Sequence, residues 1–188
     1  MTEVMNIALK VGELLEACGI RYVVGGSLAS ALCGEPRSTL DADFVVALSE
    51  GNLKGLLEGL EAEFYIDGDE LRRAVRNGSH ANAIHSTTSV KVDFFVAASR
   101  LQRQHLSRRQ RVVVAMEPER ALYFYAPEDI LVQKLVWYRA GGEISDRQWR
   151  DVAGIAEAQG NKLDWEYIRT QAEENRIGDL LGRISRDR

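Results

Sequence analysis

Long hydrophobic runs, cysteine and proline are all scarce in this sequence of 188 residues. No apolar run approaches the roughly 20 residues that a membrane-spanning helix needs, which disfavours a membrane protein. The two cysteines, Cys18 and Cys33, lack metal-ligand spacing, which argues against a disulfide framework or a zinc site and favours a reducing compartment. The first residues show no succession of basic region, apolar stretch and cleavage site, so we expect a cytoplasmic location.

An excess of basic residues is also missing. The formal net charge is -4, which disfavours a general nucleic-acid binder. The charge is uneven, however, because the segment RLQRQHLSRRQR, residues 100–111, contains five arginines and no acid. Two interpretations of this segment are equally open: a solvated surface helix and an anion-binding patch.

The order of predicted elements is mixed in the first part of the chain and helical afterwards. Apolar alternation predicts strands at 21–24, 40–48, 81–84 and 90–97, and a hairpin around Glu117-Pro118, with helical segments between them. From Pro127 onward only helical patterns remain. We therefore predict an α+β fold with a mixed sheet and flanking helices in residues 1–126, followed by a C-terminal helical region, residues 127–188, that packs on this core.

Two carboxylates are predicted on one face of the strand 40–48. Asp41 and Asp43 are two residues apart, so their side chains leave the same face, roughly 6.5–7 Å apart, while Ala42 and Phe44 take the buried face. Like charges so placed repel each other, and a divalent cation such as Mg²⁺, which prefers oxygen ligands, would remove the repulsion. Two harmless acids on a solvent-facing strand are a common alternative.

The residues before this strand indicate a place for phosphate. Gly25, Gly26 and Ser27 join a short strand to a helix, so free backbone N–H groups and the positive end of the helix dipole are available. The glycines allow a ligand to approach the backbone closely. A plain turn with a serine N-cap is the simpler alternative.

A third acid follows on a later strand. In the segment 89–96, the residues Val90, Val92 and Phe94 form the apolar stripe, and Asp93 projects to the other face. If this strand pairs with that of Asp41 and Asp43, three carboxylates come together, as two-metal phosphoryl transfer requires. Taken alone, Asp93 is more simply interpreted as an exposed aspartate on a half-buried strand.

Together these motifs resemble the nucleotidyltransferase superfamily related to DNA polymerase β. The resemblance rests on Gly-Gly-Ser, a helix, the pattern Arg37-x-Thr39-x-Asp41-x-Asp43 and the later Asp93. Within the superfamily the sequence most resembles the abortive-infection (AbiE-type) toxin branch and its bacterial relatives. That branch has a later lysine and an Arg-Asp pair, which Lys134 and Arg150-Asp151 match here. The opening motif also resembles aminoglycoside nucleotidyltransferases.

The helical part gives its own indication for Lys134. On the predicted helix 127–140 this lysine shares a face with Ile130, Leu131 and Trp137. A lysine in an apolar stripe either extends its ammonium to solvent, the commoner outcome, or meets an anion. Asp151 on the next helix either pairs with Arg147 at the surface or with Lys134 near a bound triphosphate.

The resemblance implies a metal-dependent enzyme that transfers a nucleoside monophosphate from an NTP to an acceptor hydroxyl. Asp41, Asp43 and Asp93 would hold Mg²⁺ or Mn²⁺, with Asp93 as ligand or base; Gly25, Gly26 and Ser27 would hold the phosphates. Lys134 would neutralise the triphosphate beside Asp151, and Arg37 would bind phosphate or pair with an acid. The expected acceptor is RNA, above all tRNA, or a protein, in a toxin with a cognate antitoxin. The alternatives are an aminoglycoside-type enzyme and a catalytically silent nucleotide-binding module.

Overall fold

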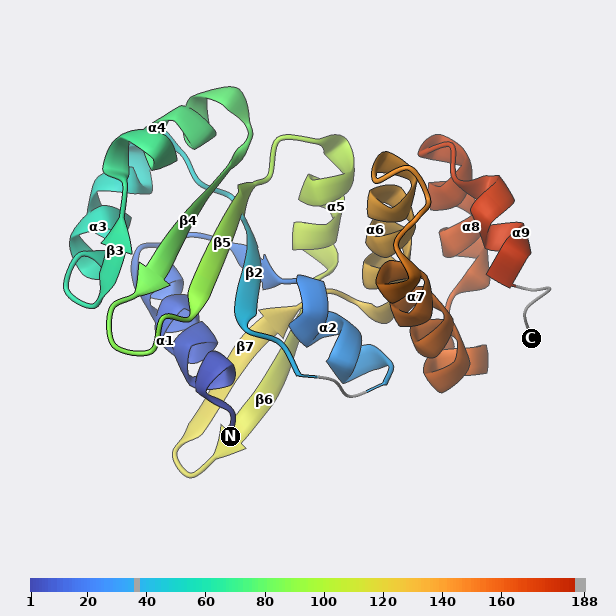
Figure 1. The fold of residues 1–188 in the computed structure, drawn as a ribbon, viewed down its shortest axis with the longest axis horizontal. Helices are drawn as coiled ribbons and strands as arrows, with labels where there is room; N and C mark the ends of the chain where they lie inside the picture. The colour runs from blue at the N-terminus through green and yellow to red at the C-terminus, as the bar shows by residue number, and fades with distance from the viewer. Residues whose placement is uncertain (36–37, 185–188) are drawn as a thin grey trace. The chain divides into compact units, whose positions relative to one another are not determined.

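The computed structural model in Figure 1 describes residues 1–35 and 38–184. These residues form two compact units, and each is described here by itself. Within the described part of the chain, no helix is both long and apolar enough to cross a membrane. The first unit comprises Met1–Leu28 and Ser38–Tyr125, and the second comprises Ala29–Arg37 and Ala126–Arg188. The assignment of domains to 1–126 and 127–188 stays a prediction; it differs from these units in the placement of residues 29–37 and of Ala126.

Seven strands of the described residues form one mixed sheet in the first unit, in the order β3-β4-β5-β2-β1-β7-β6. The pairs β2–β5 and β1–β7 are parallel, and the other neighbouring pairs are antiparallel. The predicted α+β class with a mixed sheet is therefore confirmed. The strands are β1 (Tyr22–Val24), β2 (Asp41–Val46), β3 (Phe64–Ile66), β4 (His80–His85), β5 (Lys91–Val96), β6 (Gln110–Met116) and β7 (Glu119–Phe124).

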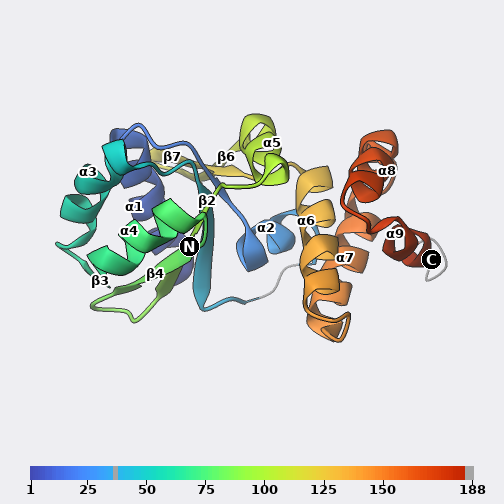
Figure 2. The same ribbon diagram turned by 90° about the horizontal axis from the view of Figure 1, so that it is seen from above.

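Three helices of the first unit pack together and against the sheet: α1 (Glu3–Ala17), α3 (Glu50–Leu60) and α4 (Gly68–Asn77). Figure 2 shows them side by side on one side of the strands. The apolar stripe of the strands lies there, since Phe44 and Phe94 are fully buried and Phe44 contacts the ring of Tyr22. The Tyr22 hydroxyl in turn donates to Glu16 on α1. Because side chains alternate along a strand, the polar residues of β2 and β5 lie on the opposite face.

Two further helices complete the first unit's connections. Helix α2 (Gly26–Cys33) follows β1 and runs from the first unit into the second. Helix α5 (Arg100–Arg108) follows β5 and contacts β1 and β2. Its start is a capping box, in which the Ser99 hydroxyl accepts from the Gln102 N–H. The arginine segment is therefore a helix for most of its length, as one of its two interpretations required.

The second unit is helical throughout its described residues. Its core packs α6 (Pro127–Ala140) against α7 (Asp146–Gln159) and α8 (Trp165–Glu174), with α9 (Gly178–Ile184) against α7 and α8. The end of α2 belongs here because the Gln159 side chain donates to the Cys33 carbonyl at 2.7 Å. Ser145 is the N-cap of α7, and its hydroxyl accepts from the Gln148 N–H at 3.3 Å.

Candidate functional site

Strand β2 places Asp41 and Asp43 on the face opposite the packed helices. Ala42 and Phe44 between and after them are fully buried, whereas both aspartates are half-buried. The Thr39 hydroxyl donates to the Asp41 carboxylate and fixes its orientation. The predicted alternation is therefore confirmed, and two carboxylates point away from the core along one strand.

Strand β5 lies beside β2 and in parallel register with it. Asp43 pairs with Asp93, and Asp41 pairs with Lys91. Paired residues of neighbouring strands project to the same face, with the strands about 4.8 Å apart. The predicted adjacency of Asp93 to the first two aspartates is thus confirmed. Across β5 the same row continues to Asn82 on β4, so Asp43, Asp93 and Asn82 form one polar row over three strands.

The turn between β1 and α2 lies against this row. The Gly25 N–H donates to the Asp43 carbonyl at 2.8 Å, so it is not one of the free backbone donors that the sequence predicts at this turn. Gly26 has φ +53, and a Cβ built on it would lie 1.7 Å from Asp43 Oδ2. Only glycine fits there, because any side chain would overlap the carboxylate. The first turn of α2 and the Asp43 carboxylate are therefore in contact, and Ser27 beside them is buried.

An aromatic side chain, Tyr125, packs against the same turn. The Tyr125 ring would lie 2.9 Å from a Cβ on Gly25, and it meets His105 of α5 edge to face at 5.1 Å. Burial, and then the nearby Arg108 charge, lower the pKa of His105 from 6.5 to about 3. His105 is thus a neutral residue packed against Tyr125.

Lys91 is a member of the site that the sequence reasoning missed. Its ammonium lies 2.7 Å from Asp93 Oδ2. The hydrogen bond to Asp93 raises the pKa of Lys91 most, and the charges of Asp93, Asp41 and Asp43 raise it further. The signal was available in the sequence, since Lys91 stands two residues before Asp93 and therefore shares its face.

The donor chemistry of this row suits a hard divalent cation. Carboxylates from two neighbouring strands, together with the Asn82 amide, are the oxygen ligands that Mg²⁺ prefers. In the conformation described for residues 1–35 and 38–184, no three His, Cys, Asp or Glu side chains lie close enough together to hold a metal ion. One cation, the Lys91 ammonium, already lies at Asp93. Convergence of Asp41, Asp43 and Asp93 on one metal site stays a prediction.

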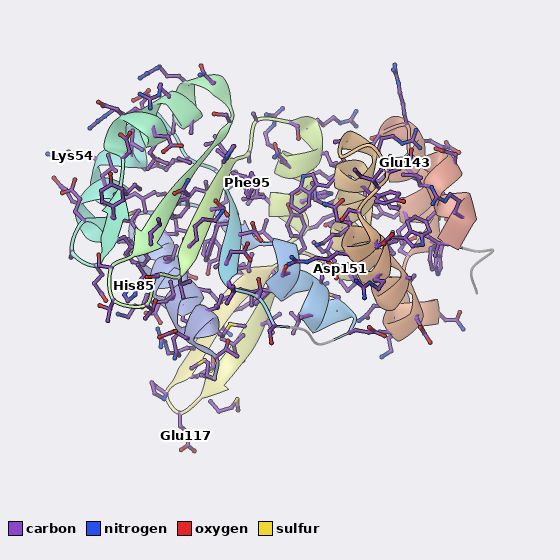
Figure 3. The ribbon with its side chains drawn as sticks, viewed as in Figure 1. Lys54, His85, Phe95, Glu117, Glu143 and Asp151 are labelled. Carbon is purple, nitrogen blue, oxygen red and sulfur yellow. The ribbon has the colours of Figure 1, made fainter. Side chains whose placement is uncertain are left out.

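In the helical unit, Lys134 and Asp151 form a buried ion pair. Lys134 Nζ lies 2.8 Å from Asp151 Oδ2, and the two side chains are only 6% and 7% exposed. Lys134 comes from α6, and Asp151, which is labelled in Figure 3, comes from α7. Of the alternatives for Lys134, the anion partner is correct, and extension into solvent is not. The role of this pair toward a triphosphate stays a prediction.

The remaining basic candidates are mostly engaged within the first unit. Arg103 donates to the Ala98 carbonyl at 2.6 Å, Arg109 lies over the Tyr123 ring at 4.1 Å, and Arg111 pairs with Glu119 at 3.0 Å. On α4, Arg72 pairs with Asp69 at 2.9 Å. Arg37, the predicted phosphate or acid partner, lies outside the described residues.

Known structures share this architecture over nearly the whole chain. An antigenic nucleotidyltransferase-like protein from Paracoccidioides brasiliensis matches 97% of this chain and 92% of its own, with a TM-score of 0.59 and 18% identity. The antibiotic-resistance factor ANT(2'')-Ia, in complex with adenylyl-2''-tobramycin, matches 94% of this chain and 98% of its own, with a TM-score of 0.58 and 12% identity. JHP933 from Helicobacter pylori matches 93% of this chain and 75% of its own, with a TM-score of 0.52 and 14% identity.

Sequence comparison adds nothing to this likeness. No protein-family model matches the chain, and no curated protein matches it. The structural similarity, at identities below 20%, concerns the fold. The chain has a nucleotidyltransferase-type fold, with two aspartates on β2 and a third in register on β5.

Proposed function

We propose that this protein is a metal-dependent nucleotidyltransferase that moves a nucleoside monophosphate from an NTP to an acceptor hydroxyl. The observation that carries the proposal is the register of Asp43 with Asp93, directly beside the glycine turn that opens α2. Oxygen ligands for a cation and the N-terminal turn of α2, which we propose as the place for phosphate, then lie within one small region of the first unit.

The residues divide the chemistry among themselves. Gly25, Gly26 and Ser27 hold the phosphates, and Asp41 and Asp43 hold Mg²⁺ or Mn²⁺ against them. When bound, the metal ion supplies positive charge to the phosphate oxygens and the leaving group. The acceptor oxygen forms a bond to the α-phosphorus while the bond from the α-phosphorus to the bridging oxygen breaks, and pyrophosphate leaves. The acceptor's hydroxyl proton passes to the Asp93 carboxylate.

Lys134 serves the triphosphate in this proposal, and Asp151 positions it. A lysine on an apolar helix has many rotamers, and a 2.8 Å pair with a buried carboxylate selects one of them. The pair leaves two of the three ammonium protons of Lys134 for other acceptors. Lys134 thus contributes charge to the nucleotide, as the resemblance of this chain to the AbiE branch implies.

Among acceptors, a small hydroxyl-bearing molecule now has more support than RNA. Binding of RNA needs a basic surface, and of the arginines in residues 100–111, Arg109 is half-buried over Tyr123 and Arg111 is partly neutralised by Glu119. The likeness to ANT(2'')-Ia extends over 94% of this chain, and that structure holds an adenylylated tobramycin. An acceptor of this type is cationic and is compatible with the net charge of -4. RNA or protein modification, as in an AbiE-type toxin with an antitoxin in the cytoplasm, is the second candidate.

Labelling decides both the reaction and the acceptor. The full chain is incubated with each of four α-³²P NTPs, Mg²⁺ or Mn²⁺, and either total tRNA or an aminoglycoside panel. We expect label in one aminoglycoside and its loss in Asp43→Asn and Asp93→Asn. Label in tRNA alone would contradict the small-molecule acceptor and support RNA as the acceptor. Nucleotide binding without any labelled product, in every combination, would leave the silent nucleotide-binding module.

A further inference from the structure

The face of the sheet that bears the polar row also bears a cation, Lys91. Lys91 and Asp93 alternate with Val92 on β5, so both side chains leave the same face, and Asp41 is the register partner of Lys91 on β2. The ammonium therefore stands among three carboxylates rather than beside a single one. It bonds Asp93 Oδ2 at 2.7 Å.

The exposure of the pair shows that this contact can be exchanged. The Lys91 side chain is 46% exposed, whereas that of Asp93 is 9% exposed. The carboxylate is thus fixed in the sheet surface, and the ammonium approaches it from the solvent side on a flexible stem.

We propose that Lys91 is a tethered cation that takes the place of one of two divalent ions, so that the enzyme binds a single exchangeable metal ion at Asp41 and Asp43. This inference rests on the proposed function. Two-ion phosphoryl transfer places one ion at the attacking oxygen and one at the leaving side, roughly 3.5–4 Å apart. The Lys91 ammonium then stabilises the attacking oxygen, and Asp93, held by Lys91, receives its proton.

Charge arithmetic gives this residue a measurable effect. An ammonium within about 5 Å of a metal position repels a divalent ion, and removal of this charge strengthens metal binding by about tenfold at a half-exposed site. The same removal takes away a charge at the attacking oxygen, and loss of one such group slows transfer about a hundredfold. Tighter metal binding with slower transfer is a combination that a purely structural lysine would not produce.

The test counts metal ions on the full chain. Mn²⁺ alone is titrated into wild type, Lys91→Met and Lys91→Arg, with free Mn²⁺ read by electron paramagnetic resonance, and Asp43→Asn defines the ion that belongs to the row. Lys54→Met is the matched control, since Lys54 is an 84% exposed lysine on α3 of the same unit and lies at the edge of the molecule in Figure 3. Circular dichroism checks that each variant is folded.

We expect one Asp43-dependent ion in wild type, Lys91→Arg and Lys54→Met, and a second ion, or about tenfold tighter binding of the first, in Lys91→Met. Transfer by Lys91→Met should be about a hundredfold slower at low Mg²⁺ and recover as Mg²⁺ is raised. Two ions on wild type, or equal titrations of wild type and Lys91→Met, would overturn the inference and leave the proposed function intact. A wild type with no Asp43-dependent ion and no labelled product would remove the proposed function and this inference with it.

Discussion

The two units of the molecule each contain a lysine–aspartate pair, and the pairs differ in exposure rather than in geometry. Lys91–Asp93 on the sheet measures 2.7 Å and Lys134–Asp151 between two helices measures 2.8 Å. The first lysine is 46% exposed and the second 6%. Water competes for the first ammonium and not for the second, so equal distances describe an exchangeable cation in one unit and a fixed one in the other.

The largest effect should come from breaking the buried pair. Lys134→Met leaves the Asp151 carboxylate without its bonded cation, and removal of one partner of a buried pair costs about 3–5 kcal/mol. Urea unfolding of wild type and Lys134→Met measures this cost. Adding Asp151→Leu to Lys134→Met should recover part of it, because the carboxylate that has lost the Lys134 ammonium is then removed. A loss below about 1 kcal/mol in Lys134→Met would mean that solvent reaches the pair.

His105 is a buried ionisable group that is neutral, in contrast to the charged Lys134–Asp151 pair. Burial holds the pKa of His105 at about 3, against 6.5 in the unfolded chain. Between these values the unfolded state binds the extra proton, so stability falls as the pH drops below 6.5, by about 1.4 kcal/mol for each unit. Unfolding at pH 7 and pH 5 should show this slope in wild type and lose much of it in His105→Phe. Equal slopes would contradict the prediction.

The glycine turn should show a smaller but local effect. Gly26→Ala adds a Cβ 1.7 Å from Asp43 Oδ2 at φ +53, so the carboxylate has to move. Gly19→Ala is the matched control, since Gly19 has φ +66 and nothing lies within 4 Å of its Cβ. Both changes carry about 1 kcal/mol of left-handed backbone strain. Nucleotidyl transfer should fall at least a hundredfold in Gly26→Ala only; equal activity in the two variants would separate Asp43 from the reaction.

The sequence predicts the exposed region better than it predicts the contacts within it. Alternation along β2 and β5 suffices to place Asp41, Asp43 and Asp93 on one face, because side-chain direction in a strand follows from period alone. The contact of Gly26 with Asp43 depends on a φ angle and a rotamer, which no pattern encodes. The same alternation also puts Lys91 on the face of Asp93, but it does not by itself predict that their side chains are in contact.

The arginine segment shows a different limit. Five arginines without an acid between residues 100 and 111 indicate a basic surface as long as only neighbours in the sequence are considered. The partner of Arg111 is Glu119, on the other strand of the β6–β7 hairpin, and Arg109 lies over Tyr123 of the same strand. Pairing across a hairpin depends on its register, which the turn fixes and composition does not. For Lys134 the partner Asp151 was among the alternatives because the resemblance pointed to both residues.

The smallest effect on stability should come from the exposed pair, and this is where the comparison between the two units is tested most directly. Lys91→Met removes a half-exposed cation, but it leaves Asp93, whose side chain is only 9% exposed, so unfolding in urea should change by about 1 kcal/mol. The repulsion among Asp41, Asp43 and Asp93 then increases, which salt screens: the difference from wild type should shrink between 0.1 M and 1 M NaCl. Lys134→Met should keep its full cost at both salt concentrations, since its partner is buried. If Lys91→Met instead lost 3 kcal/mol or more of unfolding free energy at both salt concentrations, the sheet pair would be as fixed as the helical one. That result would contradict the role of Lys91 as an exchangeable cation.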